Sequence, residues 1–221
     1  MRRHLCVAPT GRTIDQIERW RRAWDPVLAR IVPAHVTITY PEETADEDLL
    51  LRRAERLLGA TPPLRLRLGE VVAEDGGRGG VFVAVHDVDG GWADLRRHLL
   101  AEPMTPLDVP AHLTVVHPRT SARGPECLTA LAGQRLDAEI RVREVWHTET
   151  SADTFTILRR FPLATGSGRV KSLARRDRGV SASTPCSTTA PSTGPTGTSA
   201  PPPTPPPRTT PSTGSPPTPT S

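Results

Sequence analysis

Apolar and polar residues follow two different periods along this chain, and these periods predict alternating helices and strands. Between residues 17 and 31, and again between residues 92 and 99, apolar side chains recur at the spacing of an amphipathic helix. Leucines alternate with arginines over residues 64–68, and apolar residues alternate with polar ones over residues 136–142. This period of two predicts strands with one buried face. Further strands are expected at residues 4–9, 81–86 and 155–161.

Local signals mark where the helices begin and end. Thr13 and Thr44 each stand three residues before a Gln or a Glu, which is the spacing of a capping box. We therefore expect one helix to begin at each of these threonines, and the second of them to end at Gly59. Pro26 has no backbone N–H to donate, so we expect it to break the first helix.

A ten-residue segment occurs twice in the chain. Residues 32–41 read VPAHVTITYP and residues 109–118 read VPAHLTVVHP, so six of the ten positions are identical. The two histidines stand at positions 35 and 112, which are 77 residues apart. Each copy holds a His and a Thr two residues apart in a run of β-forming residues. In a strand, both side chains of such a pair point to the same face.

The predicted elements repeat together with this motif. The order strand, helix, His-Thr strand, helix, strand occurs once before residue 69 and again between residues 81 and 142, and a closing strand follows. This repeat indicates an internal duplication, and it predicts an α+β fold. We expect two lobes related by a pseudo-twofold axis, with both His-Thr strands facing one central cleft.

The C-terminal part of the chain has a different composition from the rest. Residues 165–221 consist mainly of Pro, Ser, Thr and Gly, and they contain no Phe, Trp, Tyr, Ile or Met. Such a segment buries too little apolar surface to offset the conformational entropy lost on folding, so we expect a disordered tail. Residues 1–164 are then one folded domain that contains both lobes.

The positive charge of the chain belongs to the expected tail. The whole chain carries +4, but residues 165–221 hold six basic residues and one acidic residue, which leaves −1 for residues 1–164. This balance gives no support to a basic domain that binds nucleic acid through its net charge.

The cysteines and the hydropathy indicate an ordinary soluble protein. The three cysteines show no CxxC spacing, so they predict neither a disulfide framework nor a zinc site. The first residues lack the apolar run of a signal peptide, and no stretch is long and apolar enough to span a membrane. We expect a cytoplasmic monomer that does not bind membranes.

Paired histidines and threonines suit the chemistry of phosphodiesters. Making or breaking a P–O bond beside a ribose hydroxyl needs a base on the nucleophile and an acid on the leaving oxygen. Two imidazoles can fill both roles near neutral pH, one neutral and one protonated. A hydroxyl beside each imidazole can donate a hydrogen bond to a non-bridging phosphate oxygen. This chemistry requires no metal and no cofactor, and the sequence shows no carboxylate cluster suited to hold a metal.

On these residues, the chain resembles the 2H phosphoesterases. The segments PAHVTITYP and PAHLTVV are most similar to the bacterial 2′-5′ RNA ligase-like branch, and the resemblance covers residues 1–164. It implies an enzyme that acts on 2′,3′-cyclic phosphates or 2′-5′ phosphodiesters of nucleotides or RNA, with RNA ligation as the reverse reaction. The substrate that it implies is a tRNA fragment or a small cyclic nucleotide.

The resemblance also implies a role for each motif residue. His35 and His112 correspond to the catalytic acid–base pair, and Thr37 and Thr114 to the residues that hold the phosphate. We assign His112 as the base and His35 as the acid. Relatives often carry a basic residue just after the second motif; here His117 and Arg119 follow instead, and Arg119 is the substrate-binding candidate.

Two other functions fit parts of the same pattern. The first is a nucleotide- or RNA-binding module that has the same pocket without turnover; the presence of both histidines and both threonines favours the enzyme. The second is a metal-dependent hydrolase that uses His35, His112 and His117. Strand alternation argues against it, because it turns His117 to the face opposite His112. His4 could also reach the cleft, although a structural role is the simpler expectation. For Tyr40 two positions are open: packing in its lobe or lining the cleft rim.

Overall fold

The computed structural model describes residues 2–74 and 76–165. In chain order, its elements are β1 (Arg2–Val7), α1 (Arg12–Trp24), α2 (Pro26–Ile31), β2 (Val36–Thr39), the 3₁₀ helix η1 (Pro41–Glu43), α3 (Glu47–Leu58), β3 (Leu64–Ala73), β4 (Val81–Asp87), α4 (Gly91–Leu99), β5 (His112–Val116), α5 (Gly124–Ala130), β6 (Glu139–Val142), β7 (Glu144–Thr150) and β8 (Phe155–Pro162).

These strands form one curled sheet in the order β6-β3-β4-β5-β2-β1-β7-β8, and its neighbouring strands pair antiparallel. β2 and β5 lie at the centre. Outward from β2 follow β1, β7 and β8, and outward from β5 follow β4, β3 and β6. The strand order is therefore symmetrical about the β2–β5 pair, as a pseudo-twofold axis between two lobes requires.

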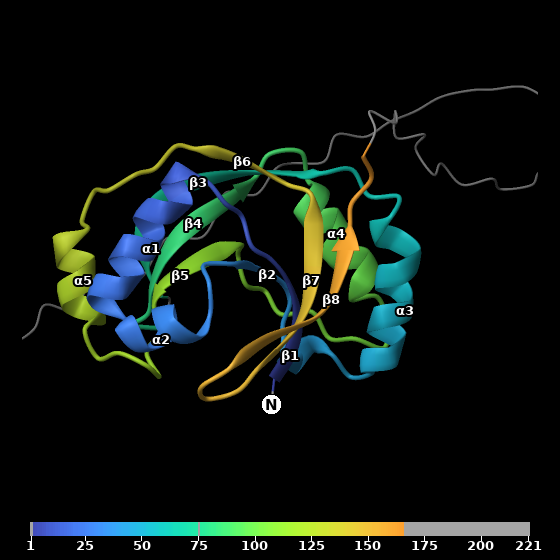
Figure 1. Ribbon diagram of the computed structural model, residues 1–221, viewed down its shortest axis with the longest axis horizontal. Helices are drawn as coiled ribbons and strands as arrows, with labels where there is room; N and C mark the ends of the chain where they lie inside the picture. The colour runs from blue at the N-terminus through green and yellow to red at the C-terminus, as the bar shows by residue number, and fades with distance from the viewer. Residues whose placement is uncertain (1, 75, 166–221) are drawn as a thin grey trace, which may run out of the picture. The chain divides into compact units, whose positions relative to one another are not determined.

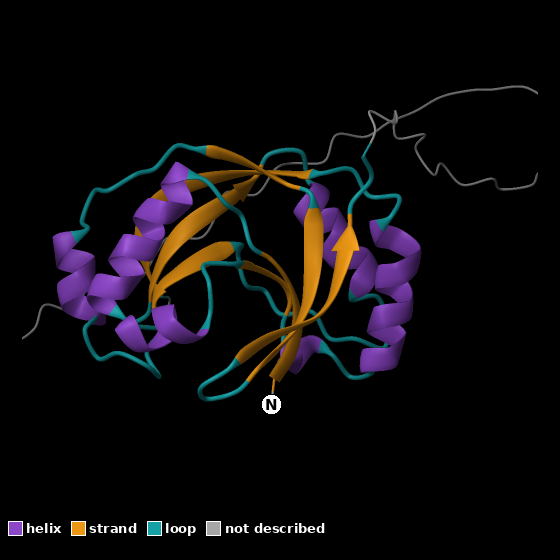
Figure 2. Cartoon of the chain, in the orientation of Figure 1, coloured by secondary structure: helices purple, strands orange, loops and turns teal. Residues whose placement is uncertain are grey.

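The helices divide into two groups, which define the two lobes. In Figure 1, α3 and α4 form one group of helices, and α1, α2 and α5 form the other. α3 contacts β8 and α4 contacts β2, whereas α1 contacts β5 and α5 contacts β3 and β4. The strands run between these two groups of helices (Figure 2). We call the half of the sheet from β2 to β8, with α3 and α4, the first lobe, and the half from β5 to β6, with α1 and α5, the second lobe. The two-lobed α+β fold expected from the sequence is confirmed.

The lobes exchange elements relative to the sequence repeat. β3 belongs to the first copy of the repeat, yet it pairs with β4 in the second lobe. The sequence pattern did not predict β7, which is the counterpart of β3 in the second copy. β7 pairs with β1 in the first lobe. The helix α1 packs against β5, and α4 packs against β2. Because each copy gives a strand and a helix to the other lobe, the two lobes share one continuous hydrophobic core.

Strand alternation separates this core from the polar residues of the motifs. Val36 and Ile38 of β2, and Leu113 and Val115 of β5, are fully buried in the core. The motif histidines and threonines occupy the positions between these aliphatic residues, and they are only partly buried. Successive side chains of a strand point to opposite faces. The same alternation that builds the core therefore leaves the other face of the central strand pair to the motif residues.

Pro26 divides the first helical segment as predicted. α1 ends at Trp24 and α2 begins at Pro26. Between them Asp25, which is fully buried, caps α2 by accepting a hydrogen bond from the N–H of Leu28 on Oδ1 at 3.0 Å. A carboxylate at this position satisfies one of the free N–H groups of the first helical turn.

The two capping boxes predicted from the sequence are wrong. α1 follows Gly11, which makes no side-chain cap, so Thr13 lies inside the helix. α3 follows Asp46, whose Oδ1 accepts a hydrogen bond from the N–H of Leu49 at 2.9 Å. The hydroxyl of Thr44 donates instead to a backbone carbonyl of the preceding 3₁₀ turn. An aspartate closer to the helix therefore displaces the predicted threonine cap.

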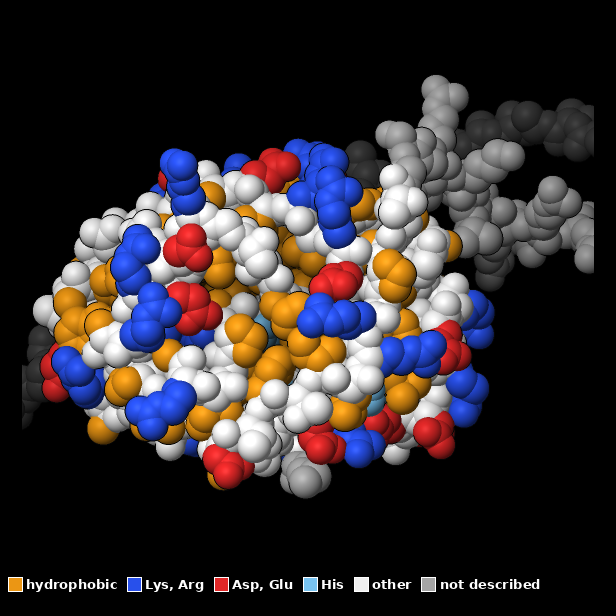
Figure 3. Space-filling view, viewed as in Figure 1, with side chains coloured by type: hydrophobic (Ala, Val, Ile, Leu, Met, Phe, Trp, Pro, Cys, Tyr) orange, Lys and Arg blue, Asp and Glu red, His pale blue; other side chains and the backbone are white. Residues whose placement is uncertain are grey.

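The surface of the described residues does not carry one dominant basic patch on the face shown in Figure 3. Arg side chains are spread over this face with Asp and Glu among them. No helix among residues 2–74 and 76–165 is long and apolar enough to cross a membrane. Apart from Thr165, the expected tail lies outside the described residues, so the domain boundary near residue 164 stays a prediction.

Candidate active site

The two His-Thr motifs meet at the centre of the sheet. Val36 of β2 and Leu113 of β5 lie opposite each other in the antiparallel pair. Each is flanked by the His and the Thr of its own motif, so this register places the histidine of each motif opposite the threonine of the other. Residues directly opposite in such a pair are about 5 Å apart between Cα atoms. The four polar side chains therefore project together from a small area of one sheet face.

The proline of each motif fixes the protonation pattern of the histidine that follows. Nδ1 of His35 lies 2.9 Å from the carbonyl oxygen of Pro33, and Nδ1 of His112 lies 2.8 Å from that of Pro110. A carbonyl oxygen can only accept a hydrogen bond, so Nδ1 must donate in both cases. In the neutral form of each ring, Nε2 then carries the lone pair. Both imidazoles can therefore accept a proton on Nε2.

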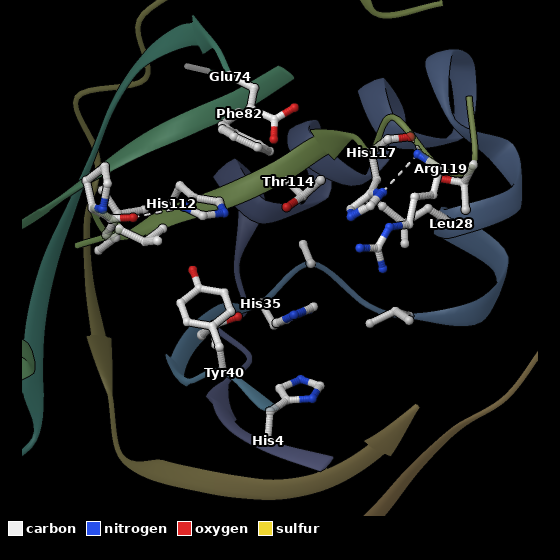
Figure 4. Close-up of a pocket in the computed structure, with 18 of the residues that line it drawn as sticks. His4, Leu28, His35, Tyr40, Glu74, Phe82, His112, Thr114, His117 and Arg119 are labelled. Atoms are coloured by element: carbon white, nitrogen blue, oxygen red, sulfur yellow. Dashed lines mark hydrogen bonds between the residues drawn. The ribbon is translucent and has the colours of Figure 1, made fainter. Parts of the chain in front are cut away.

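The motif residues line one large pocket with a volume of about 830 Å³. Figure 4 shows His35 and His112 projecting into it from different strands, with Thr114 beside His112. All five residues predicted from the sequence to form the site line this pocket: His35, Thr37, His112, Thr114 and Arg119. The expectation of a single cleft shared by both motifs is confirmed. The catalytic and binding roles of these residues stay predictions.

Each motif histidine packs against an aromatic ring. The ring of His112 stacks on Phe82 of β4, with ring centroids 4.3 Å apart. The ring of His35 lies 5.5 Å from that of His4 on β1 and 6.5 Å from that of Phe155 on β8. These contacts restrict both imidazoles and reduce their access to water.

Burial lowers the pKa of both motif histidines. Desolvation lowers the pKa of His35 to about 4, against a smaller opposing effect of the Pro33 carbonyl, and the Arg21 cation lowers it further. Desolvation also lowers the pKa of His112, but here the proline carbonyl and the Glu74 carboxylate both favour the charged form. Both rings are therefore neutral near pH 7. Protonation is less unfavourable at His112, where the Glu74 carboxylate acts on the ring, than at His35, where the effect of the Arg21 cation outweighs that of the Glu18 carboxylate.

Three of the four arginines that line the pocket are already paired with carboxylates. These pairs are Arg2 with Glu42, Arg21 with Glu18, and Arg78 with Glu74. The fourth, Arg119, forms no ion pair or side-chain hydrogen bond within the described part of the chain. Its guanidinium is therefore available to an anionic ligand.

His117 lines the pocket, and the prediction that its side chain faces away from the cleft is wrong. The alternation argument fails because β5 ends at Val116. The N–H of His117 leaves the strand ladder and donates to Oδ2 of Asp25 at 3.0 Å. The backbone turns at this point and carries the imidazole toward the cavity.

Several pocket residues were left open or missed by the sequence analysis. His4 and Tyr40 both line the pocket, which resolves the two alternatives considered for them. Phe82 and Glu74 also line it, yet no motif marked either residue. Phe82 lies opposite Thr114 in the β4–β5 pair. Finding it from the sequence would have required the register of that pair.

The pocket does not present an obvious set of metal ligands. Within residues 2–74 and 76–165, no group of three or more His, Cys, Asp or Glu side chains is arranged to hold a metal ion. His35 and His112 each use Nδ1 to donate to a carbonyl, which leaves one nitrogen per ring facing the cavity.

The sequence matches the family model of the 2′-5′ RNA ligase superfamily over residues 9–154. A comparison with curated proteins gives no match.

Comparison with solved structures gives matches that cover nearly the whole of the other chain. The crystal structure of E. coli LigT complexed with 3′-AMP has a TM-score of 0.53 at 19% identity, over 73% of this chain and 97% of that chain. The crystal structure of a phosphoesterase has a TM-score of 0.54 at 19% identity, over 74% and 98%. The crystal structure of TT0787 of Thermus thermophilus has a TM-score of 0.51 at 18% identity, over 74% and 98%. At these identities the comparison establishes a shared fold.

Proposed function

Because the chain belongs to the 2′-5′ RNA ligase superfamily of 2H phosphoesterases, we propose that it is a metal-independent phosphoesterase. Its substrates are 2′,3′-cyclic phosphates or 2′-5′ phosphodiesters of nucleotides or RNA. The observation that carries this proposal is the convergence of both His-Thr motifs on one pocket, with a free Nε2 on each imidazole.

In hydrolysis of a cyclic phosphate, one histidine acts as base and the other as acid. The base takes a proton from water on Nε2 while the water oxygen bonds to phosphorus. The acid gives a proton from Nε2 to the ribose oxygen whose bond to phosphorus breaks. The products are a phosphomonoester and a free ribose hydroxyl. Thr37 and Thr114 donate to the non-bridging oxygens as negative charge increases there.

The electrostatics of the pocket favour His35 as the base and His112 as the acid. This is the reverse of the assignment expected from the sequence. Burial holds the pKa of His35 at about 4, whereas Glu74 opposes the effect of burial on the pKa of His112. A bound phosphate raises the pKa of both imidazoles, because an opposite charge nearby favours the protonated form. His112, whose pKa the Glu74 carboxylate raises, then protonates before His35, whose pKa the Arg21 cation lowers.

Nucleotide ligands of a structural relative support a nucleotide substrate. E. coli LigT has been crystallised with 3′-AMP, with ATP and with NADP⁺. The pocket of this chain, at about 830 Å³, exceeds what one phosphate needs and falls in the range of pockets that hold ligands of drug size. A nucleoside attached to the reacting phosphate therefore fits the available volume.

The proposal is tested by turnover in the presence of a chelator. The full-length chain is treated with EDTA and given adenosine 2′,3′-cyclic phosphate, a 2′-5′ dinucleotide and the matching 3′-5′ dinucleotide. We expect turnover of the cyclic phosphate or the 2′-5′ dinucleotide, and a loss of at least about a hundredfold in H35A and in H112A. His98 lies exposed on α4, so H98A is the matched control and should retain activity.

The other two functions considered above are outcomes of the same experiment. Tight binding of these nucleotides without turnover by the native chain would favour the binding module. Loss of turnover on chelation, with recovery when a divalent metal is added back, would favour the metal-dependent hydrolase.

A further inference from the structure

We propose that His117 and Arg119 form a second anion-binding subsite of the pocket, which holds a second phosphate group of the substrate. This inference rests on the proposed function, because it takes the reacting phosphate to lie among the four motif side chains. The second phosphate is either the 5′-phosphate of the same nucleotide or the next internucleotide phosphate of an RNA chain.

The turn that carries these two residues is held in place by a buried carboxylate. Oδ2 of Asp25 accepts hydrogen bonds from the N–H of His117 at 3.0 Å and from the hydroxyl of Thr120 at 2.6 Å. The N–H of Thr120 also donates to the carbonyl of His117 at 3.0 Å. Asp25 is fully buried, and its other oxygen caps α2. The turn therefore presents its side chains from a fixed backbone.

His117 has the opposite tautomer from the two motif histidines. Its Nδ1 accepts a hydrogen bond from the backbone N–H of Arg119 at 3.1 Å, drawn as a dashed line in Figure 4. Since Nδ1 is the acceptor, the neutral ring carries its proton on Nε2. Burial and the neighbouring Arg119 cation lower the pKa of His117, which keeps the ring neutral. His117 is therefore a hydrogen-bond donor through Nε2, whereas His35 and His112 have a lone pair there.

Arg119 supplies the charge that this donor lacks. Figure 4 shows the His117 ring and the Arg119 side chain together at the end of the cavity near Leu28. The other arginines of the lining are paired with carboxylates, while Arg119 has no such partner among the described residues. A fixed N–H donor beside an unpaired guanidinium is suited to a phosphate group.

The position of this subsite separates it from the reacting phosphate. His117 follows Thr114 by three residues, a distance of roughly 10 Å along an extended strand. At the same repeat distance of 77 residues, the counterpart of His117 is Tyr40, which also lines the pocket. One end of the cavity thus carries an imidazole donor and a cation, and the other carries a phenol. This asymmetry gives the substrate one preferred direction in a pocket that is otherwise pseudo-symmetrical.

The test compares the binding of ligands that differ by one phosphate. Calorimetry on the full-length chain measures Kd for 3′-AMP, for adenosine 3′,5′-bisphosphate and for the dinucleotide ApAp with a 3′-terminal phosphate. We expect the 5′-phosphate or the internucleotide phosphate to tighten binding at least about tenfold over 3′-AMP, the low end for hydrogen bonds to charged groups. The ligand that binds more tightly than 3′-AMP identifies which of the two phosphates occupies the subsite.

Variants at the subsite show which residues cause the tighter binding of ligands with two phosphates. R119A should remove this gain, so that the ligands with two phosphates bind the variant no more tightly than 3′-AMP does. R141A removes one positive charge from an exposed position on β6 and should keep the gain, which controls for net charge. H117Q retains an amide donor near the place of Nε2, whereas H117N retains an acceptor near the place of Nδ1 but has no donor at Nε2. We expect the gain to survive in H117Q and to fall in H117N.

Three results would overturn the inference: equal Kd values for all three ligands, a gain that persists in R119A, or no measurable binding of either ligand with two phosphates. Failure of the proposed function looks different. If a second phosphate tightens binding but no substrate is turned over, the subsite stands and the catalytic proposal fails. If substrate is turned over but a second phosphate does not tighten binding, the catalytic proposal stands and the subsite fails.

Discussion

Each motif histidine depends on the proline two residues before it. Proline has a fixed φ and no N–H, but its carbonyl remains free to accept a hydrogen bond. In both motifs this carbonyl accepts from Nδ1 of the histidine and leaves Nε2 for the pocket. The repeated Pro-Ala-His-x-Thr pattern therefore specifies more than two residue types, because it also sets the tautomer that a base on Nε2 needs.

The buried His4 makes the stability of the fold depend on pH. Desolvation lowers the pKa of His4 to about 3, while the ring in an unfolded chain titrates near 6.5. Between these values the unfolded state binds a proton at His4 that the folded state does not. His4 alone therefore lowers stability as the pH decreases below about 6.5, by at most about 1.4 kcal/mol per pH unit. Urea unfolding at pH 6.5, 5.5 and 4.5 should show a shallower dependence in H4Q. The exposed His98 is the control: H98Q should keep the slope of the native chain, and an equally steep slope in H4Q would contradict this explanation.

The two threonines should matter less for turnover than the histidines. Thr37 and Thr114 line the pocket beside the opposite motif's histidine, where each can donate one hydrogen bond to the phosphate. We expect T37A and T114A to reduce kcat/KM by about tenfold to a few hundredfold, because each variant loses one donor to a developing negative charge. Serine at either position restores the hydroxyl and should recover most of the loss. Full activity in both alanine variants would remove the threonines from the mechanism.

Strand alternation places the motif side chains correctly in the pocket only as far as each strand continues. His35, Thr37, His112 and Thr114 were found because they repeat and because alternation holds inside β2 and β5. The same alternation misplaced His117, since the strand ends one residue earlier and the chain then follows Asp25. Asp25 is 92 residues away from His117 in the chain, and no local pattern reveals that contact.

Among the elements, the junction between α1 and α2 connects directly to the pocket. Pro26 ends one helix and begins the next, and this places Asp25 where it can cap α2 and also hold the turn after β5. The break in the helix was predictable from proline chemistry. The second role of Asp25 was not, because it depends on the packing of α1 against β5.

Removal of the Asp25 carboxylate should therefore destabilise the fold strongly. D25A leaves the N–H groups of Leu28 and His117 and the hydroxyl of Thr120 without their acceptor in a buried setting. Loss of a cap together with unsatisfied buried donors amounts to about 2–4 kcal/mol. D46A removes the exposed cap of α3 and should cost only about 1 kcal/mol. Equal losses for the two variants in urea unfolding would show that the buried network around Asp25 contributes little.

The strand β7 shows why one element escaped prediction. Glu144–Thr150 reads as charged and polar residues around Val145 and Trp146, so it lacks the apolar alternation of β3. Yet His147 and Thr148 are buried, and Thr148 hydrogen-bonds to Nε2 of His4 at 3.2 Å. His147 faces Glu47 of α3, with Nε2 3.1 Å from the carboxylate, and Thr148 is paired with His4 of the neighbouring strand β1. That pairing is visible only once β1 and β7 are known to be neighbours.

Over the whole molecule, the exchange of elements between the lobes holds the two motifs in one pocket. β3, β7, α1 and α4 each belong to one copy of the repeat and pack in the lobe of the other. The repeat predicted two lobes, the pseudo-twofold relation and the shared cleft. It did not predict the exchange, since two lobes with separate sheets would give the same sequence pattern.

A buried ion pair links the two copies of the repeat within the first lobe. Both oxygens of Glu43, at the end of η1, accept hydrogen bonds from Arg96 of α4, at 2.6 and 3.1 Å, and they also accept from the N–H groups of Tyr40 and Leu107. E43A leaves a buried cation without its partner and should cost about 3–5 kcal/mol. E42A breaks only the exposed pair with Arg2 and should cost at most about 1 kcal/mol. Thermal unfolding of the two variants would reveal the difference, and a small loss in E43A would mean that this ion pair contributes little to the stability of the fold.

The central claim is that His35 and His112 act as one unit on one phosphate, and the kcat/KM of the double variant H35A/H112A tests it most directly. Each single variant should lose at least about a hundredfold on the cyclic or 2′-5′ substrate. The effects of mutating groups that act together are strongly non-additive. The kcat/KM of the double variant should therefore be no more than a few-fold below that of the less active single variant. Losses that multiply, or nearly full activity in either single variant, would contradict the account.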